Sequence, residues 1–174
     1  PAVTASTGIA ATHIGGYTIH SWSGIGARSE LTRREIDELT QKEATVKRVN
    51  ATDVLIIEEV SMLDGRLLDS LDAVLRALRQ NHEPFGGMHI VMVGDFFQLP
   101  PVSKIDARRF AFASRAWQAI TPVVCYLTEQ YRQEDAAFLS LLSAIRHHEV
   151  SARHRDMLQS RIVGPETEIG VATT

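Results

Sequence analysis

Short apolar runs alternate with amphipathic segments along this chain. The runs at residues 53–57 and 89–93 have the length of strands and carry almost no polar residue, which predicts strands buried on both sides. Between them, residues 64–80 repeat leucine and valine at helical spacing, which predicts a long amphipathic helix. Apolar strands that alternate with helices are typical of a parallel sheet covered by helices on both faces, so the pattern predicts an α/β fold.

Weaker patterns predict the remaining elements. Further strands are expected at residues 1–5 and 123–127, and further helices at residues 114–120 and 136–146. The chain begins in the first of these strands and stops at residues 168–174, where another strand is under way. We therefore expect a piece of a longer protein, with its fold truncated at both ends.

A charged segment at residues 32–49 stands apart from this alternation. Thr32 and Glu35 have the spacing of a capping box, which predicts a helix that begins there. Its apolar stripe is thin, so we expect a small appendage that does not belong to the core.

Composition narrows the class of protein. The 174 residues carry a formal net charge of -3, with a pI of about 6.2, so nucleic-acid binding would depend on a local patch or on backbone amides. The single cysteine, Cys125, excludes an internal disulfide and a cysteine-based zinc cluster, and its apolar neighbours predict a buried side chain. With no long apolar run and no signal peptide, we expect a soluble intracellular protein without membrane contact.

Polar clusters follow three of the predicted strands. They are residues 4–8, Glu58 with Glu59, and residues 94–98. In a parallel sheet the carboxyl ends of the strands lie along one edge, where ligands bind. The three clusters therefore predict one site at that edge.

The acid pair and the glutamine of these clusters favour nucleotide chemistry. After a buried strand, one carboxylate such as Glu58 can hold Mg²⁺ through its waters while the next, Glu59, orients or deprotonates an attacking water. A carboxamide such as Gln98 can hydrogen-bond both a γ-phosphate oxygen and that water. The alternatives are a surface pair at the amino end of the following helix and an exposed amide where the strand leaves the sheet.

Five motifs resemble one family in their order and spacing. They are T-A-S-T-G-I-A-A at residues 4–11, G-Y-T-I-H-S-W at 16–22, L-I-I-E-E-V-S-M-L at 55–63, V-G-D-F-F-Q-L-P-P-V at 93–102 and L-T-E-Q-Y-R-Q at 127–133. Together they span most of the chain and closely resemble the PIF-type, RecD-like DNA helicases of superfamily one. The resemblance implies a RecA-like parallel sheet.

The resemblance implies roles at the nucleotide. Glu58 resembles the family's Mg²⁺ ligand and Glu59 its catalytic acid. Gln98 resembles the phosphate-sensing glutamine, and Arg132 the arginine that reaches the γ-phosphate from the second motor domain. The implied cofactors are ATP and Mg²⁺.

The resemblance also implies contacts to single-stranded DNA. Small hydroxylated residues and glycine let backbone and side chains approach phosphates closely, and planar side chains let bases stack. Core positions remain the alternative for His20 and Trp22. The implied DNA-binding residues are Thr4, Ser6, Thr7, Gly8, Thr18, His20 and Trp22.

The domain organisation expected from the resemblance has two parts. Residues 1–125 would form the first RecA-like motor domain without its phosphate-loop part, with a small wedge insertion at about 23–50, and residues 126–174 would begin the second. The parent protein would be a monomeric ATP-dependent helicase that moves 5′ to 3′ on single-stranded DNA, opens duplex junctions and serves DNA repair and recombination. We expect it in the bacterial cytoplasm, or in the nucleus or mitochondrion of a eukaryote.

Two departures from the family pattern open alternatives. The family has aspartate where this chain has Glu58, and Mg²⁺ demands near-ideal octahedral geometry. The three lysines, Lys42, Lys47 and Lys104, follow no glycine, so the Gly-Lys-Ser/Thr phosphate loop is expected before Pro1, and this chain alone should not hydrolyse ATP. A catalytically inactive nucleic-acid-binding remnant is the second hypothesis, and an RNA-stimulated NTPase or regulatory switch is the third.

Overall fold

The computed structural model describes residues 1–102, 110–129 and 135–163. The chain divides into two compact units, Pro1–Val124 and Cys125–Thr174. Among the described residues, no helix is long and apolar enough to cross a membrane.

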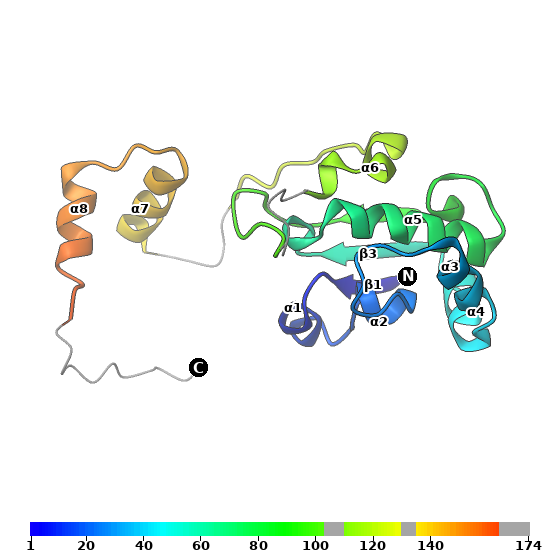
Figure 1. The fold of residues 1–174 in the computed structure, drawn as a ribbon. Helices are drawn as coiled ribbons and strands as arrows, with labels where there is room; N and C mark the ends of the chain where they lie inside the picture. Colours follow the sequence, from blue (N-terminus) through cyan, green and yellow to red (C-terminus); the bar gives the residue numbers. More distant parts are fainter. Residues whose placement is uncertain (103–109, 130–134, 164–174) are drawn as a thin grey trace. The chain divides into compact units, whose positions relative to one another are not determined.

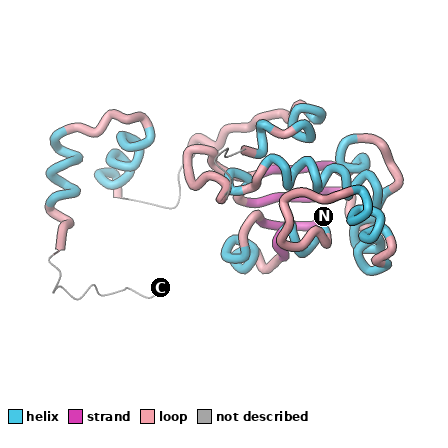
Figure 2. Tube along the Cα trace, in the orientation of Figure 1, coloured by secondary structure: helices cyan, strands magenta, loops and turns pink. Residues whose placement is uncertain are grey.

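A four-stranded parallel sheet forms the centre of the first unit (Figure 1, Figure 2). Its order is β2 (Tyr17–Thr18), β1 (Ala2–Ala5), β3 (Val54–Glu58) and β4 (His89–Met92). Every neighbouring pair is parallel. The parallel α/β architecture predicted from the apolar runs is confirmed.

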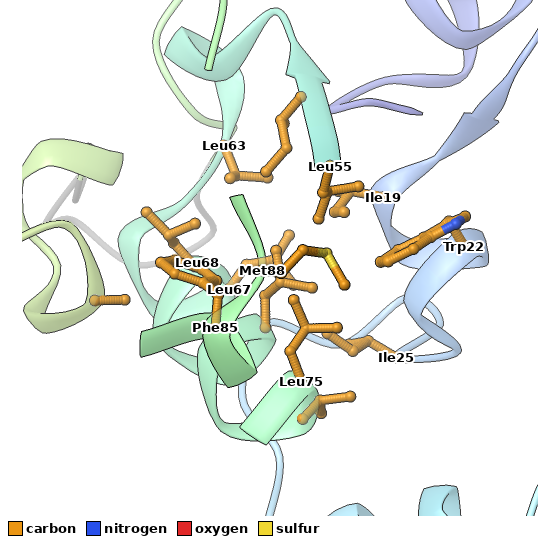
Figure 3. Packing of buried hydrophobic residues seen from close by; sticks show 14 of the residues in the cluster. Ile19, Trp22, Ile25, Leu55, Leu63, Leu67, Leu68, Leu75, Phe85 and Met88 are labelled. Atoms are coloured by element: carbon orange, nitrogen blue, oxygen red, sulfur yellow. The ribbon is translucent and has the colours of Figure 1, made fainter. Parts of the chain in front are cut away.

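The helix α5 (Gly65–Arg79) packs its apolar face against this sheet. Asp64 caps its start by accepting a hydrogen bond from the Arg66 amide, and the helix predicted at residues 64–80 is confirmed. Leu55 and Ile57 of β3 lie in the same buried cluster as the α5 leucines. Figure 3 shows Leu55 together with Leu67, Leu68 and Leu75 in this cluster. The opposite face is more open, since Val3 and Val91, which flank Ile56 in the register, are 40% and 44% exposed.

Short elements connect the strands. At the start of the chain, α1 (Gly8–His13) follows β1, and α2 (Ile19–Ser23) follows β2. The 3-10 helix η1 (Val60–Met62) lies between β3 and α5, and η2 (Pro84–Gly87) lies between α5 and β4. The 3-10 helix η3 (Ala111–Ala113) and α6 (Arg115–Ile120) complete the unit, and α6 confirms the helix predicted at residues 114–120.

The charged segment forms two helices, α3 (Arg33–Thr40) and α4 (Glu43–Asn50), rather than one. The capping box is confirmed: Thr32 Oγ1 accepts from the Glu35 amide at 3.3 Å, and Glu35 Oε2 accepts from the Thr32 amide at 2.8 Å. The expectation that this segment stays outside the core is wrong, because Leu39 and Val49 belong to the buried cluster.

The prediction of a strand at residues 123–127 is wrong. The structure has no strand at 121–129, and Val123 and Leu127 are 93% and 94% exposed. Cys125 is exposed as well, so its predicted burial is also wrong. A strand needs a neighbour that pairs with its amides and carbonyls, and none of the four strands in the described residues pairs with this run.

The second unit contains two described helices, α7 (Ala136–Arg146) and α8 (Ala152–Gln159). The helix predicted at residues 136–146 is confirmed. Asp135 caps α7 by accepting from the amides of Ala137 and Phe138. At the start of α8, Ser151 and His154 form a capping box.

Candidate functional site

The carboxyl ends of β1, β3 and β4 meet at one edge of the sheet. Ala5 pairs with Glu58, and Ile57 pairs with Met92. The segments that follow these strands are therefore adjacent, as the three polar clusters predicted. The Val60 amide donates to the Val93 carbonyl at 3.0 Å, which joins the segment after β3 to the segment after β4.

Glu59 lies at a sharp backbone turn in this edge. Its φ of 56° and ψ of 44° place it in the left-handed region, directly before η1. A non-glycine residue held there costs about 1–3 kcal/mol and persists only where surrounding contacts enforce it. Two such contacts are the Val60 bond and the bond from the Met62 amide to the Glu59 carbonyl at 3.1 Å.

Gly94 permits the close approach of the two segments. A Cβ built on Gly94 would lie 2.9 Å from the Val60 amide nitrogen and 3.0 Å from Val60 Cγ1. Any side chain at this position would displace the backbone that follows Glu59. Glycine is required here by the lack of space.

Two predicted DNA-binding hydroxyls bond inside the fold instead. Thr4 is fully buried, and its hydroxyl donates to the Ile56 carbonyl at 2.8 Å. Ser6 is 9% exposed, and its hydroxyl donates to the Glu59 carbonyl at 2.7 Å. In this structure both hydroxyls therefore brace β1 against β3, which corrects the expectation that they face a nucleic acid.

The other predicted DNA contacts fall into two groups. Thr7 and Thr18 cap α1 and α2 by accepting from the amides three residues ahead, and Gly8, the first residue of α1, is exposed. Burial lowers the pKa of His20, which is half-buried, so its ring is neutral at pH 7 and offers a planar surface rather than a charge.

Trp22 belongs to the core. It is 3% exposed, and its ring lies among Ile19, Ile25 and Leu55 (Figure 3). A base cannot stack on a ring that the core already covers. The prediction that Trp22 stacks on DNA does not hold in this structure, and the alternative of a core aromatic does.

Gln98 is held by Asp95, a residue to which the sequence analysis assigned no role of its own. Gln98 Nε2 donates to Asp95 Oδ2 at 3.2 Å, and the Phe97 amide donates to Asp95 Oδ1 at 3.0 Å. The Gln98 amide also donates to the Asp95 carbonyl at 3.0 Å. Aspartate that bonds the backbone two residues ahead is typical of an Asx turn, so the D-F-F-Q spacing was the available signal.

An aromatic cluster around Phe96 packs against the loop that contains Gln98. The ring of Phe96 packs edge-on against Phe112, Trp117 and Phe110, with centroids 5.0, 5.9 and 6.1 Å apart. The loop between β4 and Gln98 is thereby attached to η3 and α6. Phe97, next to this cluster, is 82% exposed.

Arg132 lies outside the described residues. Glu58 and Glu59 are both half-buried, and Gln98 is exposed. Carboxylate oxygens suit Mg²⁺, which keeps several waters and takes only one or two protein carboxylates beside phosphate oxygens. Glu58, the last residue of β3, fits that donor set by its chemistry and its place at the edge. The described residues contain no group of three or more histidine, cysteine, aspartate or glutamate side chains arranged for a metal.

Two open hollows lie along α5. The larger, of about 360 Å³, is lined by Asp69, Asp72 and Arg115 among others, and the smaller, of about 300 Å³, by Glu30 and Arg66 among others. Neither includes Glu58, Glu59 or Gln98. The crevice that the sequence led us to expect at those residues is not one of these hollows.

Comparisons with known proteins identify the family. The family model described as PIF1-like helicase matches residues 1–156. The ATP-dependent DNA helicase Pif1 of Psychrobacter sp. (strain PRwf-1) is 53% identical over 136 residues, which are 76% of this chain and 21% of that protein. The human ATP-dependent DNA helicase PIF1 is 44% identical over 144 residues, which are 82% of this chain and 22% of the human protein. The chain thus spans about a fifth of the length of these relatives.

Solved structures agree with these relatives. The crystal structure of Pif1 helicase from Candida albicans matches with a TM-score of 0.78 and 40% sequence identity. The match covers 95% of this chain and 38% of the Candida albicans chain. Pif1 helicase from Bacteroides, in complex with ADP-AlF3 and ssDNA, has a TM-score of 0.77 and 32% identity, with 93% and 40% covered. This chain belongs to the PIF1-like helicase family.

Proposed function

We propose that the complete protein is an ATP-dependent DNA helicase that moves 5′ to 3′ on single-stranded DNA and opens duplex junctions. The observation that carries this proposal is the meeting of the motif-bearing segments after β1, β3 and β4 at one sheet edge. The family membership of residues 1–156 supports it, as does the ADP-AlF3 and ssDNA complex of the Bacteroides relative.

In this proposal each polar group at the edge has one task. Glu58 would hold Mg²⁺, which when bound neutralises charge on the phosphates. The Glu59 carboxylate would accept a proton from water while the water oxygen attacks the γ-phosphorus and the bond to the β–γ bridging oxygen breaks. Gln98 would contact the γ-phosphate, and its bond to Asp95 is the contact that it would exchange for the nucleotide.

The second unit would supply a positive charge to the γ-phosphate. We propose that residues 126–174 begin a second motor domain and that Arg132 reaches the γ-phosphate from there, where a guanidinium stabilises the charge on the transferring oxygens. Thr7, Gly8, Thr18 and His20 would contact the single-stranded DNA. The contact would be made by exposed backbone and by the plane of the neutral His20 imidazole.

Replacing Glu59 tests the assignment in the full-length protein. We expect Glu59→Gln to lower the DNA-stimulated kcat by about 10²–10⁴-fold, because the amide cannot accept the proton. Nucleotide affinity and single-stranded DNA affinity, measured by fluorescence titration, should stay near the wild-type values. Glu83→Gln, which makes the same change on an exposed loop away from the edge, is the matched control and should keep full turnover.

The same titrations distinguish the proposed helicase from the alternative of a catalytically inactive remnant. Glu58 in the place of the family's aspartate is the observation that favours this alternative, because the longer side chain changes the position of any bound ion. A full-length protein that binds single-stranded DNA but neither binds nor hydrolyses ATP would establish the remnant and overturn the helicase proposal.

A further inference from the structure

Ser6 joins the segment after β1 to the acid pair through two bonds. Its amide donates to the Glu58 carbonyl at 3.0 Å, which continues the pairing of β1 with β3 by one residue. Its hydroxyl donates to the Glu59 carbonyl at 2.7 Å. With 9% of Ser6 exposed, both bonds are shielded from water, so their loss would not be fully replaced by solvent.

The hydroxyl bond acts on one end of a peptide group whose other end is also fixed. The Glu59 carbonyl and the Val60 amide belong to the same peptide plane. Ser6, directly after β1, donates to the carbonyl, and the Val93 carbonyl, directly after β4, accepts from the amide at 3.0 Å. Both flanking strands therefore set the orientation of this plane.

The orientation of this peptide plane decides the backbone conformation of Glu59. Rotating the plane changes ψ of Glu59, and the observed pair of φ 56° and ψ 44° is an unfavourable one for a glutamate. A residue in a strained conformation returns to an ordinary one when the contacts that enforce it are removed. The Glu59 side chain would then leave the position that the turn gives it.

We propose that the Ser6 hydroxyl is a positioning group that holds the Glu59–Val60 peptide. Through this contact, the binding of single-stranded DNA at the neighbouring residues would be transmitted to the Glu59 carboxylate. This inference rests on the proposed function for the chemical role of Glu59. Ser6 directly precedes Thr7 and Gly8, so any shift of this segment on DNA binding is passed through the hydroxyl to the peptide plane. The hydroxyl is thus a route by which DNA would stimulate hydrolysis.

Three variants of the full-length protein test this role. Ser6→Ala removes the hydroxyl, and Ser6→Thr keeps it. Ser70→Ala is a matched control, because Ser70 is also 9% exposed and its hydroxyl donates to a distant backbone carbonyl, that of Ser29, at 3.1 Å. Ser70 lies within α5, and its bond to Ser29 does not involve the Glu59–Val60 peptide.

The first measurement is ATP hydrolysis with and without saturating single-stranded DNA. For Ser6→Ala we expect kcat at saturating DNA to fall about tenfold, while KM for ATP and Kd for a labelled oligonucleotide stay within about twofold. Ser6→Thr should recover most of the lost turnover, and Ser70→Ala should match wild type. A weaker Kd for DNA with unchanged kcat at saturation would show that Ser6 is a DNA contact and would overturn the proposal, and so would equal losses in Ser6→Ala and Ser70→Ala.

The second measurement is hydrogen exchange of the peptide that contains residues 58–63, which needs no catalytic activity. We expect faster exchange in Ser6→Ala than in wild type or Ser70→Ala, because the Val60 amide loses the fixed orientation that its bond to Val93 requires. Unchanged exchange would overturn the positioning role whatever the activity. A wild-type protein without DNA-stimulated hydrolysis would instead overturn the proposed function, and exchange alone would then decide whether Ser6 positions this peptide.

Discussion

Gly94 shows, at the scale of a single residue, how tightly the site edge is packed. A methyl group at this position would lie 2.9 Å from the Val60 nitrogen, which is backbone and cannot rotate away. We expect Gly94→Ala to destabilise the chain by about 1–3 kcal/mol, because the contact forces the two segments apart. Thermal unfolding followed by circular dichroism measures this loss.

A glycine in open space provides the comparison. Gly8, the first residue of α1, has no heavy atom within 4 Å of a built Cβ and no positive φ. Gly8→Ala should therefore unfold near the wild-type temperature. Equal unfolding temperatures for Gly94→Ala and wild type would show that the edge is more open than the structure describes.

Residue spacing predicted the acid pair at the sheet edge because both glutamates directly follow the apolar run at residues 53–57. It could not predict which small polar side chains turn inward. Thr4 and Ser6 have the composition of a phosphate-binding segment, yet their hydroxyls bond to β3, and Trp22 fills the core. These outcomes depend on which strand lies beside β1, and that is a tertiary fact absent from the local sequence.

At the scale of elements, one carboxylate of α5 binds the connection from α5 to β4 directly. Asp72 of α5 accepts from the Phe85 amide at 2.6 Å and from Arg76 Nε at 2.9 Å. Phe85 is fully buried at a φ of 51°, so η2 holds an unfavourable conformation directly before β4. We expect Asp72→Ala to cost about 1–3 kcal/mol, because the Phe85 amide loses its acceptor at a partly buried position.

Asp72→Asn separates this bond from the ion pair with Arg76. The asparagine oxygen still accepts from the Phe85 amide, so urea unfolding should place this variant between Asp72→Ala and wild type. If Asp72→Asn were as unstable as Asp72→Ala, the ion pair and not the amide bond would hold the turn.

The elements that sequence predicted well are those with long periodic patterns. The α5 helix, the capping box of α3 and the central strands needed only local spacing. The run at residues 123–127 has the same apolar composition as a strand, but it pairs with none of the strands in the described residues. Apolar runs of this length identify a strand only when a neighbour is present, so composition alone was insufficient there.

On the scale of the whole molecule, the chain carries the acid pair to which the proposed function assigns nucleotide chemistry, but its sequence contains no Gly-Lys-Ser/Thr motif. Phosphate groups are held by a glycine-rich loop that ends in Gly-Lys-Ser/Thr, and Lys42, Lys47 and Lys104 follow glutamine, valine and serine. The net charge of -3 offers no general attraction for a triphosphate. Under the proposed function, no Gly-Lys-Ser/Thr loop within these 174 residues would align ATP with Glu59.

This division of tasks predicts that the 174-residue chain alone releases no phosphate from ATP, with or without single-stranded DNA, while the full-length protein does so and is stimulated by DNA. The reason is that Glu59 can activate water only against a γ-phosphorus that other groups hold in line with it. Phosphate release by both proteins at matched concentrations measures the difference. Release by the short chain that disappears in its own Glu59→Gln variant would contradict the prediction, because the loss would exclude a contaminating ATPase and show that the edge binds ATP unaided.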